Sequence, residues 1–250
     1  MKQTKILMGM PITIEIVDRE ALERDFDNVF KYFQRVDEKF STYKGSSEIS
    51  RINRGELKQS EYSGEMKTVF ELSEQTKKET KGFFDVKKPD GLIDPSGLVK
   101  GWAIFNAAKI LELAGFKNFY IEAGGDIQVF GNNSYGKAWS VGIRNPFKPQ
   151  EIIKIVYVTN QGVATSGTYI RGQHIYNPHQ RGQNIDEIVS LTVVGPNIYE
   201  ADRFVTAAFA MGREGIVFIE NLKGFEAYMV DKGAIATSTT GFEQYYAQLG

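Results

Sequence analysis

This chain contains hydrophobic patterns typical of helices and others typical of strands. The order of these patterns along the sequence constrains the fold more than any other feature. Apolar residues recur at three- and four-residue steps over residues 19–40, which predicts an amphipathic helix. The same criterion predicts helices over 64–79, 99–113 and 199–211, and alternating or short apolar runs predict strands over 10–17, 118–123, 127–130, 139–143, 152–159, 188–194 and 225–230. Helices come first and strands gather later, so we expect an α+β fold. A doubly wound dinucleotide fold is disfavoured, because no G-x-G-x-x-G follows a strand.

The composition excludes several classes of function. The chain has 250 residues, with 30 Lys and Arg against 31 Asp and Glu, so no overall positive field exists to bind nucleic acid or an anionic membrane. It has no cysteine and two histidines, which excludes thiolate chemistry and a multi-histidine metal cage. No run approaches the ~20 apolar residues of a membrane span, and the N-terminus lacks the apolar region of a signal peptide. We therefore expect a cytoplasmic protein of one domain, unless an exported precursor was trimmed. The oligomeric state stays open.

A carboxylate and a hydroxyl share one face of the predicted helix over 199–211. Asp202 and Thr206 are four residues apart, so their side chains stack along the helix. Two hard oxygen ligands suit Mg²⁺ and do not suit a soft metal. The alternative is that Asp202 only complements the positive N-terminal end of the helix.

A second candidate site precedes the helix predicted over 99–113. Asp94 or Ser96 could cap this helix, and Gly97 would let a ligand approach the backbone closely. Free amides at the helix N-terminus, together with Lys100, would bind a phosphate oxygen. The alternative is a capped helix with an exposed lysine.

Paired glycines stand between two predicted strands. Gly124 and Gly125, followed by Asp126, suit a tight hairpin turn. They equally suit a place where a flat or phosphorylated ligand meets bare backbone.

Small hydroxyl residues and a histidine form a fourth group. Thr165, Ser166 and Gly167 could offer several hydrogen bonds to a ligand, and His174 could act as a general base near neutral pH. The alternative for His174 is a purely structural role.

Two residues near the N-terminal third could hold a flat ring. Tyr43 could stack on one side of such a ring and Met8 could pack against the other. The alternative is a loop whose aromatic side chain fills the edge of the core.

Taken in order, these segments resemble the motifs of the FAD:protein FMN transferase family, known as ApbE. The segments that carry the resemblance run from residue 8 to about residue 212 and read MGMP, FSTYKGSSEISRIN, DPSGLVKGWA, EAGGDIQVFG, VATSGTY, HIYNP and SLTVVGPNIYEADRFVTAAFAMG. The resemblance implies one ApbE-like domain over residues 1–250, a mainly antiparallel sheet packed with helices. It also implies an enzyme that uses FAD and Mg²⁺ to attach FMN to a threonine of an acceptor protein, with release of AMP.

The resemblance also implies roles for individual residues. The side chains of Asp202 and Thr206 and the carbonyl of Gly97 match magnesium ligands, and His174 matches the base for the acceptor hydroxyl. Positions that match or line the flavin site are Met8, Tyr43, Phe83, Phe84, Asp85, Asp94, Lys100, Gly124, Gly125, Asp126, Thr165, Ser166, Gly167 and Tyr176.

Three differences between this sequence and the family pattern leave other functions open. Family members often have a second acid where this chain has Val205, and a longer stretch between Asp85 and Asp94. Many are exported lipoproteins, whereas this sequence shows neither a signal nor a cysteine. A hydrolase that cuts FAD to FMN and AMP, or a protein that binds FAD without chemistry, would use the same residues.

Overall fold

An eight-stranded antiparallel sheet forms the centre of the molecule in the computed structural model, which describes residues 1–168, 177–179 and 185–246. The strand order is β1-β2-β3-β4-β7-β8-β9-β10, and a separate hairpin pairs β5 with β6. The strands are β1 (Lys2–Leu7), β2 (Met10–Ile16), β3 (Phe119–Ala123), β4 (Asp126–Phe130), β5 (Trp139–Arg144), β6 (Ile152–Val158), β7 (Gly162–Gly167), β8 (Ile188–Gly195), β9 (Glu226–Asp231) and β10 (Ala236–Ser238). Every neighbouring pair is antiparallel, which confirms the expected α+β class.

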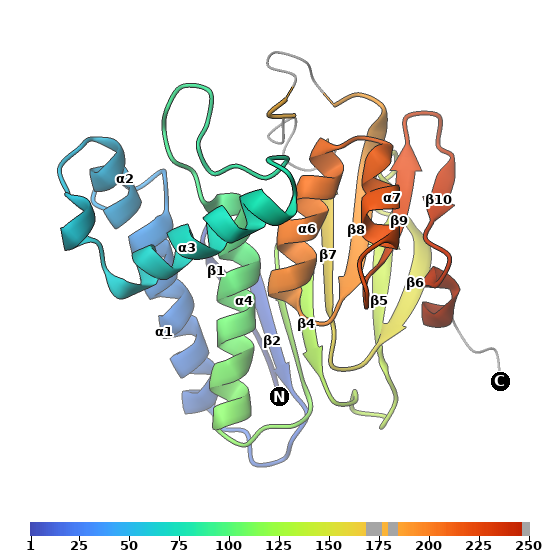
Figure 1. Cartoon of the computed structure of the whole chain (residues 1–250). Coiled ribbons are helices and arrows are strands. Elements are labelled where there is room, and N and C mark those ends of the chain that lie inside the picture. The colour runs from blue at the N-terminus through green and yellow to red at the C-terminus, as the bar shows by residue number, and fades with distance from the viewer. Residues whose placement is uncertain (169–176, 180–184, 247–250) are drawn as a thin grey trace.

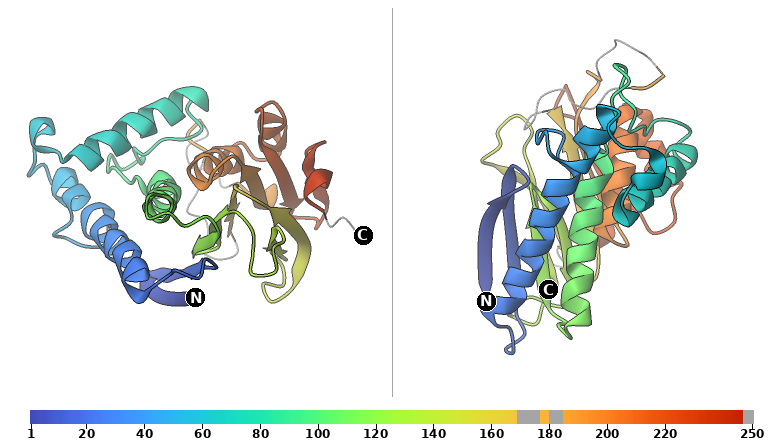
Figure 2. Two further views of the ribbon diagram at one scale, coloured as in Figure 1. Left: turned by 90° about the horizontal axis from the view of Figure 1, so that it is seen from below. Right: turned by 90° about the vertical axis from the view of Figure 1, so that its left-hand side faces the viewer.

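Helices cover one face of the sheet and the β5–β6 hairpin covers part of the other (Figures 1 and 2). Figure 2 shows α3 on the outer side of α1 and α4. The helices are α1 (Glu23–Phe40), α2 (Glu48–Asn53), α3 (Gly64–Glu79), α4 (Ser96–Leu113), α6 (Ile198–Ala210) and α7 (Glu214–Glu220), with short 3₁₀ turns η1 (Gln59–Glu61) and η2 (Phe242–Tyr245). None of the helices in the described ranges combines the length and apolarity needed to cross a membrane.

The main core lies between the helices and the sheet. Alternating Ile12, Ile14 and Ile16 of β2 are completely buried, and the apolar stripe of α1 packs in the same core through residues such as Phe26 and Phe33. A second, smaller core lies between the main sheet and the β5–β6 hairpin. Together the two cores fix the sheet as the rigid support from which the site residues extend.

Most predicted elements are present, with shifts at their ends that have local causes. Helix α1 begins at Glu23 rather than residue 19, because the Asp25 carboxylate accepts a hydrogen bond from the Leu22 amide at 2.9 Å and caps this end. Helix α4 begins at Ser96, directly after Pro95. Strands β1, β7 and β10 and helices α2 and α7 were not predicted, since their sequences are short or lack a clear apolar period.

Several segments that carry the motifs meet at one end of the sheet. In the register of β2 and β3, Ile12 pairs with Ala123, so the turns that follow β1 and β3 lie at the same end. Helix α4 leads through a short connection into the opposite end of β3, which brings the N-terminus of α4 to this end as well (Figure 1). The sheet register therefore gathers segments that are about a hundred residues apart in the sequence.

Candidate active site

A buried cluster of three charged side chains lies where α4, α6 and β4 meet. The ammonium of Lys100 lies 2.7 Å from Asp126 Oδ2 and 3.6 Å from Asp202 Oδ1. Asp126 is 1% exposed and Asp202 is 3% exposed, so both carboxylates are shielded from solvent. One ammonium faces two carboxyl groups here, so the cluster would carry one net negative charge with both of them ionised, which a bound cation would neutralise.

The close approach of α4 to α6 positions Asp202. The amide of Gly101 donates a hydrogen bond to Asp202 Oδ2 at 2.8 Å. A Cβ atom at Gly101 would lie 2.5 Å from the Cβ of Asp202 and 2.9 Å from the carbonyl oxygen of Ile198. Only glycine at this position lets the two helices come this close.

Burial is the largest influence on the titration of Asp202. It raises the pKa of Asp202 well above the ordinary aspartate value, and the neighbouring Asp126 raises it further. Lys100 and the Gly101 amide act in the opposite direction. A cation bound beside Asp202 would favour the ionised form of this carboxyl group.

Further oxygen donors lie beside Asp202. Thr206 is one turn further along α6, and its Oγ1 lies 3.5 Å from the carbonyl oxygen of Gly97 at the start of α4. Both the Thr206 methyl and the Phe84 ring lie 3.4 Å from where a Cβ at Gly97 would stand, so this backbone is closely packed. The carboxylate, hydroxyl and carbonyl are the donor types that Mg²⁺ prefers, and the set therefore fits that ion.

The described residues supply few further acidic ligands. They contain no group of three or more histidine or acidic side chains placed to hold a metal. Val205 is completely buried in the main core, and its side chain offers no oxygen ligand. A bound Mg²⁺ would complete its six ligands with water or phosphate oxygens.

The segment from Phe83 to Asp94 packs against the N-terminus of α4. The Phe84 amide donates to Thr80 Oγ1 at 3.1 Å, and Asp85 forms an ion pair with Lys77 at 2.7 Å. Asp94 accepts a hydrogen bond from the Ser96 amide at 3.1 Å, but the N-cap position of α4 is Pro95 and has no side-chain cap, so neither Asp94 nor Ser96 is the N-cap residue. The short loop closes through a bridge between Lys87 and Ile93.

The motif that contains Tyr43 is connected to this loop by Asn53. The side chain of Asn53 donates to the carbonyl of Ile93 at 2.9 Å and accepts from its amide at 2.8 Å. Tyr43 itself is 98% exposed, and no hydrogen bond, ion pair or ring contact among the described residues involves it. The structure therefore does not bring Tyr43 into the buried cluster.

Two turns with positive φ angles lie at the same end of the sheet as the cluster. Met8 and Gly9 (φ 53° and 72°) form the turn between β1 and β2, and Gly124 and Gly125 (φ 58° and 94°) form the turn between β3 and β4. The hairpin considered for the paired glycines is therefore present. Because Asp126 follows this turn directly, the glycine backbone lies beside the charged cluster.

The small hydroxyl residues belong to strand β7. The Thr165 amide donates to Asp126 Oδ1 at 3.2 Å, which joins β7 to the cluster. The Thr165 hydroxyl shares a hydrogen bond with Thr192 Oγ1 at 2.9 Å, Ser166 is buried, and Gly167 ends the strand. His174 and Tyr176 lie outside the described residues.

Sequence reasoning did not single out three residues that the structure connects to the site. Gly101 and Asn53 stand inside quoted motifs, and Arg203 directly follows Asp202. An isolated glycine inside a helical pattern indicates close packing, and this signal could have identified Gly101. No local pattern marks Asn53 or Arg203, because their partners are distant in the sequence.

Comparison with known proteins places this arrangement in a family. The family model described as "ApbE family" matches residues 8–88 and 86–229. A protein of Klebsiella pneumoniae named FAD:protein FMN transferase is 31% identical over 154 residues, which cover 58% of this chain and 44% of the relative. This chain thus matches less than half of the length of that relative. A protein of the same name from Haemophilus influenzae is 23% identical over an alignment of 319 positions, which covers 97% of this chain and 92% of the relative.

Solved structures have the same fold. The flavin transferase ApbE from Vibrio cholerae superposes with a TM-score of 0.85 at 22% identity, covering 98% of each chain. The ApbE protein from Thermotoga maritima gives a TM-score of 0.87 at 20% identity, covering 99% of each chain. With the family model matching most of its length, the chain belongs to the ApbE family.

Proposed function

We propose that this chain is a Mg²⁺-dependent FAD:protein FMN transferase, which attaches FMN from FAD to a threonine of an acceptor protein and releases AMP. Membership of the ApbE family and the names of the matched relatives support this activity. The observation that carries the proposal is the meeting of oxygen donors from Asp202, Thr206 and Gly97 beside the ammonium of Lys100. This combination suits a pyrophosphate bound together with a divalent cation.

The chain's residues divide into a phosphate-binding part and a flavin-binding part. Lys100 and the first amides of α4 would bind non-bridging oxygens of the FAD pyrophosphate. Asp202, Thr206 and the Gly97 carbonyl would hold Mg²⁺, which supplies positive charge that offsets the charge gathering on those oxygens. The residues proposed to contact the flavin or line its pocket are Met8, Tyr43, Phe83, Phe84, Asp85, Asp94, Gly124, Gly125, Asp126, Thr165, Ser166, Gly167 and Tyr176.

The reaction needs a base and an oriented acceptor. The threonine hydroxyl oxygen attacks the phosphorus on the FMN side, the bond from this phosphorus to the bridging oxygen breaks, and AMP leaves. We assign the base to His174, which would accept the hydroxyl proton. Holding FAD and the acceptor threonine together removes the entropy cost of a bimolecular encounter.

The test is the intact mass of an acceptor domain that carries a threonine motif of the family type. The domain is incubated with this protein, FAD and Mg²⁺, with an EDTA control. We expect a mass increase of one FMN that EDTA abolishes. AMP release without a mass increase would instead establish FAD hydrolysis. FAD binding that is indifferent to Mg²⁺, with no AMP, would establish a flavin-binding protein.

A further inference from the structure

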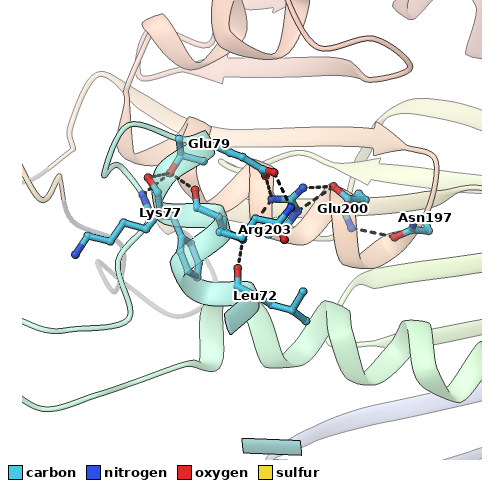
Figure 3. A network of polar contacts seen from close by, with 10 residues as sticks. Leu72, Lys77, Glu79, Asn197, Glu200 and Arg203 are labelled. Atoms are coloured by element: carbon cyan, nitrogen blue, oxygen red, sulfur yellow. Dashed lines mark hydrogen bonds and ion pairs between the residues drawn. The ribbon is translucent and has the colours of Figure 1, made fainter. Parts of the chain in front are cut away.

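Arg203 is a buried cation that lies next to Asp202 in the sequence and contacts a different helix. It is 4% exposed, and its guanidinium extends from α6 to the last turns of α3 (Figure 3). Asp202 contacts Lys100 and Gly101 on α4, whereas Arg203 donates hydrogen bonds to Thr76 and Glu79 on α3. Two consecutive residues thus fix α6 against two helices.

The guanidinium donates four hydrogen bonds to three side chains. Its Nε and Nη2 donate to Glu200 Oε2 at 2.9 and 2.5 Å, and its Nη1 donates to Thr76 Oγ1 at 3.3 Å and to Glu79. Its carbon lies 3.9 Å from the centre of the Phe204 ring, within the range of a cation–π contact. Because the guanidinium is planar and its donors point in fixed directions, it fixes the orientation of α6 relative to α3. A lysine ammonium would do this less well.

The same part of α3 that Arg203 holds also supports two of the proposed flavin residues. Thr80 follows Glu79 directly and accepts the amide hydrogen of Phe84 at 3.1 Å. Lys77 forms the 2.7 Å ion pair with Asp85. Phe84 in turn packs on Gly97, whose carbonyl faces Thr206. A continuous path of contacts therefore runs from Arg203 through the end of α3 to the segment at the N-terminus of α4.

If Arg203 only stabilised the fold, its contacts would not need to lead to the segment that contains Phe84 and Asp85. The side chains of Glu79 and Glu200 are 37% and 25% exposed, so solvent already reaches part of the network. Replacing a buried ion pair with apolar residues of similar volume is often neutral or stabilising, so we infer that this network serves to fix one arrangement of the helices. The arrangement selected here sets where α3 ends and the segment with Phe84 and Asp85 begins.

We propose that Arg203 is a positioning residue for FAD, which fixes the last turn of α3 so that Phe84 and Asp85 are held in place beside the Asp202 site. The proposal rests on the proposed function for its ligand, FAD. It assigns Arg203 no contact with the reacting atoms.

The test compares Arg203→Met with Arg54→Met, a matched control. Arg54 also donates two hydrogen bonds to a glutamate, Glu56, at 2.6 and 3.0 Å, but this pair is exposed and outside the network. Hydrogen–deuterium exchange of peptides over residues 80–86 is measured without ligand, and the FAD dissociation constant is measured at saturating Mg²⁺. Both are measured well below each variant's melting temperature.

We expect Arg203→Met to speed exchange over 80–86 and to weaken FAD binding, each by about tenfold, because hydrogen bonds to charged groups are lost. The rate of transfer at saturating FAD should change less than the dissociation constant, and Arg54→Met should change neither quantity. If Arg203→Met does not fold, Glu79→Gln and Arg203→Lys give the same comparison with smaller changes in volume. A lower melting temperature with unchanged exchange and FAD affinity would overturn the proposal. The exchange measurement needs no FAD, so a wild-type protein that binds no FAD would refute the proposed function separately.

Discussion

The carboxylate of Asp202 accepts the amide hydrogen of Gly101 at 2.8 Å, across the interface between α6 and α4. The residue before Gly101 is Lys100, so the same turn of α4 presents both an amide and an ammonium to the site. The contact exists because Gly101 has no side chain to keep the helices apart. The geometry of the candidate site therefore depends on one glycine that faces α6.

Replacing Gly101 with alanine should disturb both folding and the site. A Cβ at this position would lie 2.5 Å from Asp202 Cβ, so α4 and α6 must separate. We expect Gly101→Ala to lower the free energy of unfolding by about 1–3 kcal/mol, as overpacking does, and to reduce Mg²⁺-dependent transfer. Urea denaturation measures the first effect. Gly64→Ala is the control, since nothing lies within 4 Å of a Cβ there. Equal unfolding midpoints for both variants would contradict the packing argument.

Asp202→Asn should distinguish the role of the negative charge of Asp202 from its role in the fold. The amide oxygen can still accept the Gly101 hydrogen, so we expect the variant to fold. It loses the negative charge proposed to hold Mg²⁺, and the transfer rate should fall by about a hundredfold or more. The measurement is a time course of FMN addition by intact mass, with Asp27→Asn, whose partner Lys5 is on the exposed surface, as control. A folded Asp202→Asn variant with the wild-type rate would rule out this role.

His174→Ala should affect transfer without affecting FAD binding. If His174 is the base, its removal leaves the phosphate-binding and flavin-binding residues intact. We expect a similar FAD dissociation constant and a transfer rate about a hundredfold lower in single-turnover assays. An unchanged single-turnover rate would mean that another group accepts the proton.

The features that can be predicted best from the sequence are those that depend only on residues close together in the chain. The helix over 64–79 has the predicted bounds, because its apolar spacing is reinforced by Ser63, whose hydroxyl accepts the Met66 amide hydrogen at the N-terminus. Asp202 and Thr206 share a helix for a similarly local reason: a spacing of four residues places them one turn apart. Both inferences needed only the period of an α-helix.

Features that depend on distant contacts could not be predicted in this way. Strand β7 contains small and hydroxyl residues with no clear alternation, and it forms because β4 and β8 pair with it on either side. Likewise, no local pattern shows that Asp126 pairs with Lys100 or that Arg203 reaches Glu79. The ordered motifs of the ApbE family gave the candidate residues, and the tertiary structure gave the pairings among them.

The effects on stability of replacing Lys100 and of replacing Asp126 should be strongly coupled, because the two residues form a buried ion pair. Lys100→Met would leave two buried carboxylates without their cation, which we expect to cost about 3–5 kcal/mol of unfolding free energy. Adding Asp126→Asn should restore part of this loss, because the amide needs no counter-charge and can still accept the Thr165 amide hydrogen. Urea denaturation of the two single variants and the double variant gives the coupling energy. A double variant whose loss of unfolding free energy equals the sum of the two single losses would show that the charges act independently.

Asp18 should make the stability of the protein sensitive to acid. Its carboxylate accepts hydrogen bonds from the amides of Lys117 and Asn118 at 2.9 and 2.8 Å and from the Asn118 side chain at 2.9 Å, joining the end of β2 to the start of β3. Burial alone would raise the pKa of Asp18, but the hydrogen bonds outweigh it and the pKa lies below its usual value.

A carboxylate whose pKa is lowered by folding stabilises the native state above its unfolded pKa of about 3.9, and the contribution is lost as the pH falls through the folded value. Asp18→Asn should therefore lower the free energy of unfolding by about 1–2 kcal/mol at pH 7, where the wild-type carboxylate is ionised. The difference between the two proteins should shrink as the pH is lowered from about 5 to 3, because the wild-type carboxylate becomes protonated. Urea midpoints measured across this range test the effect. A difference that stays constant down to pH 3 would show that the charge of Asp18 does not contribute to stability.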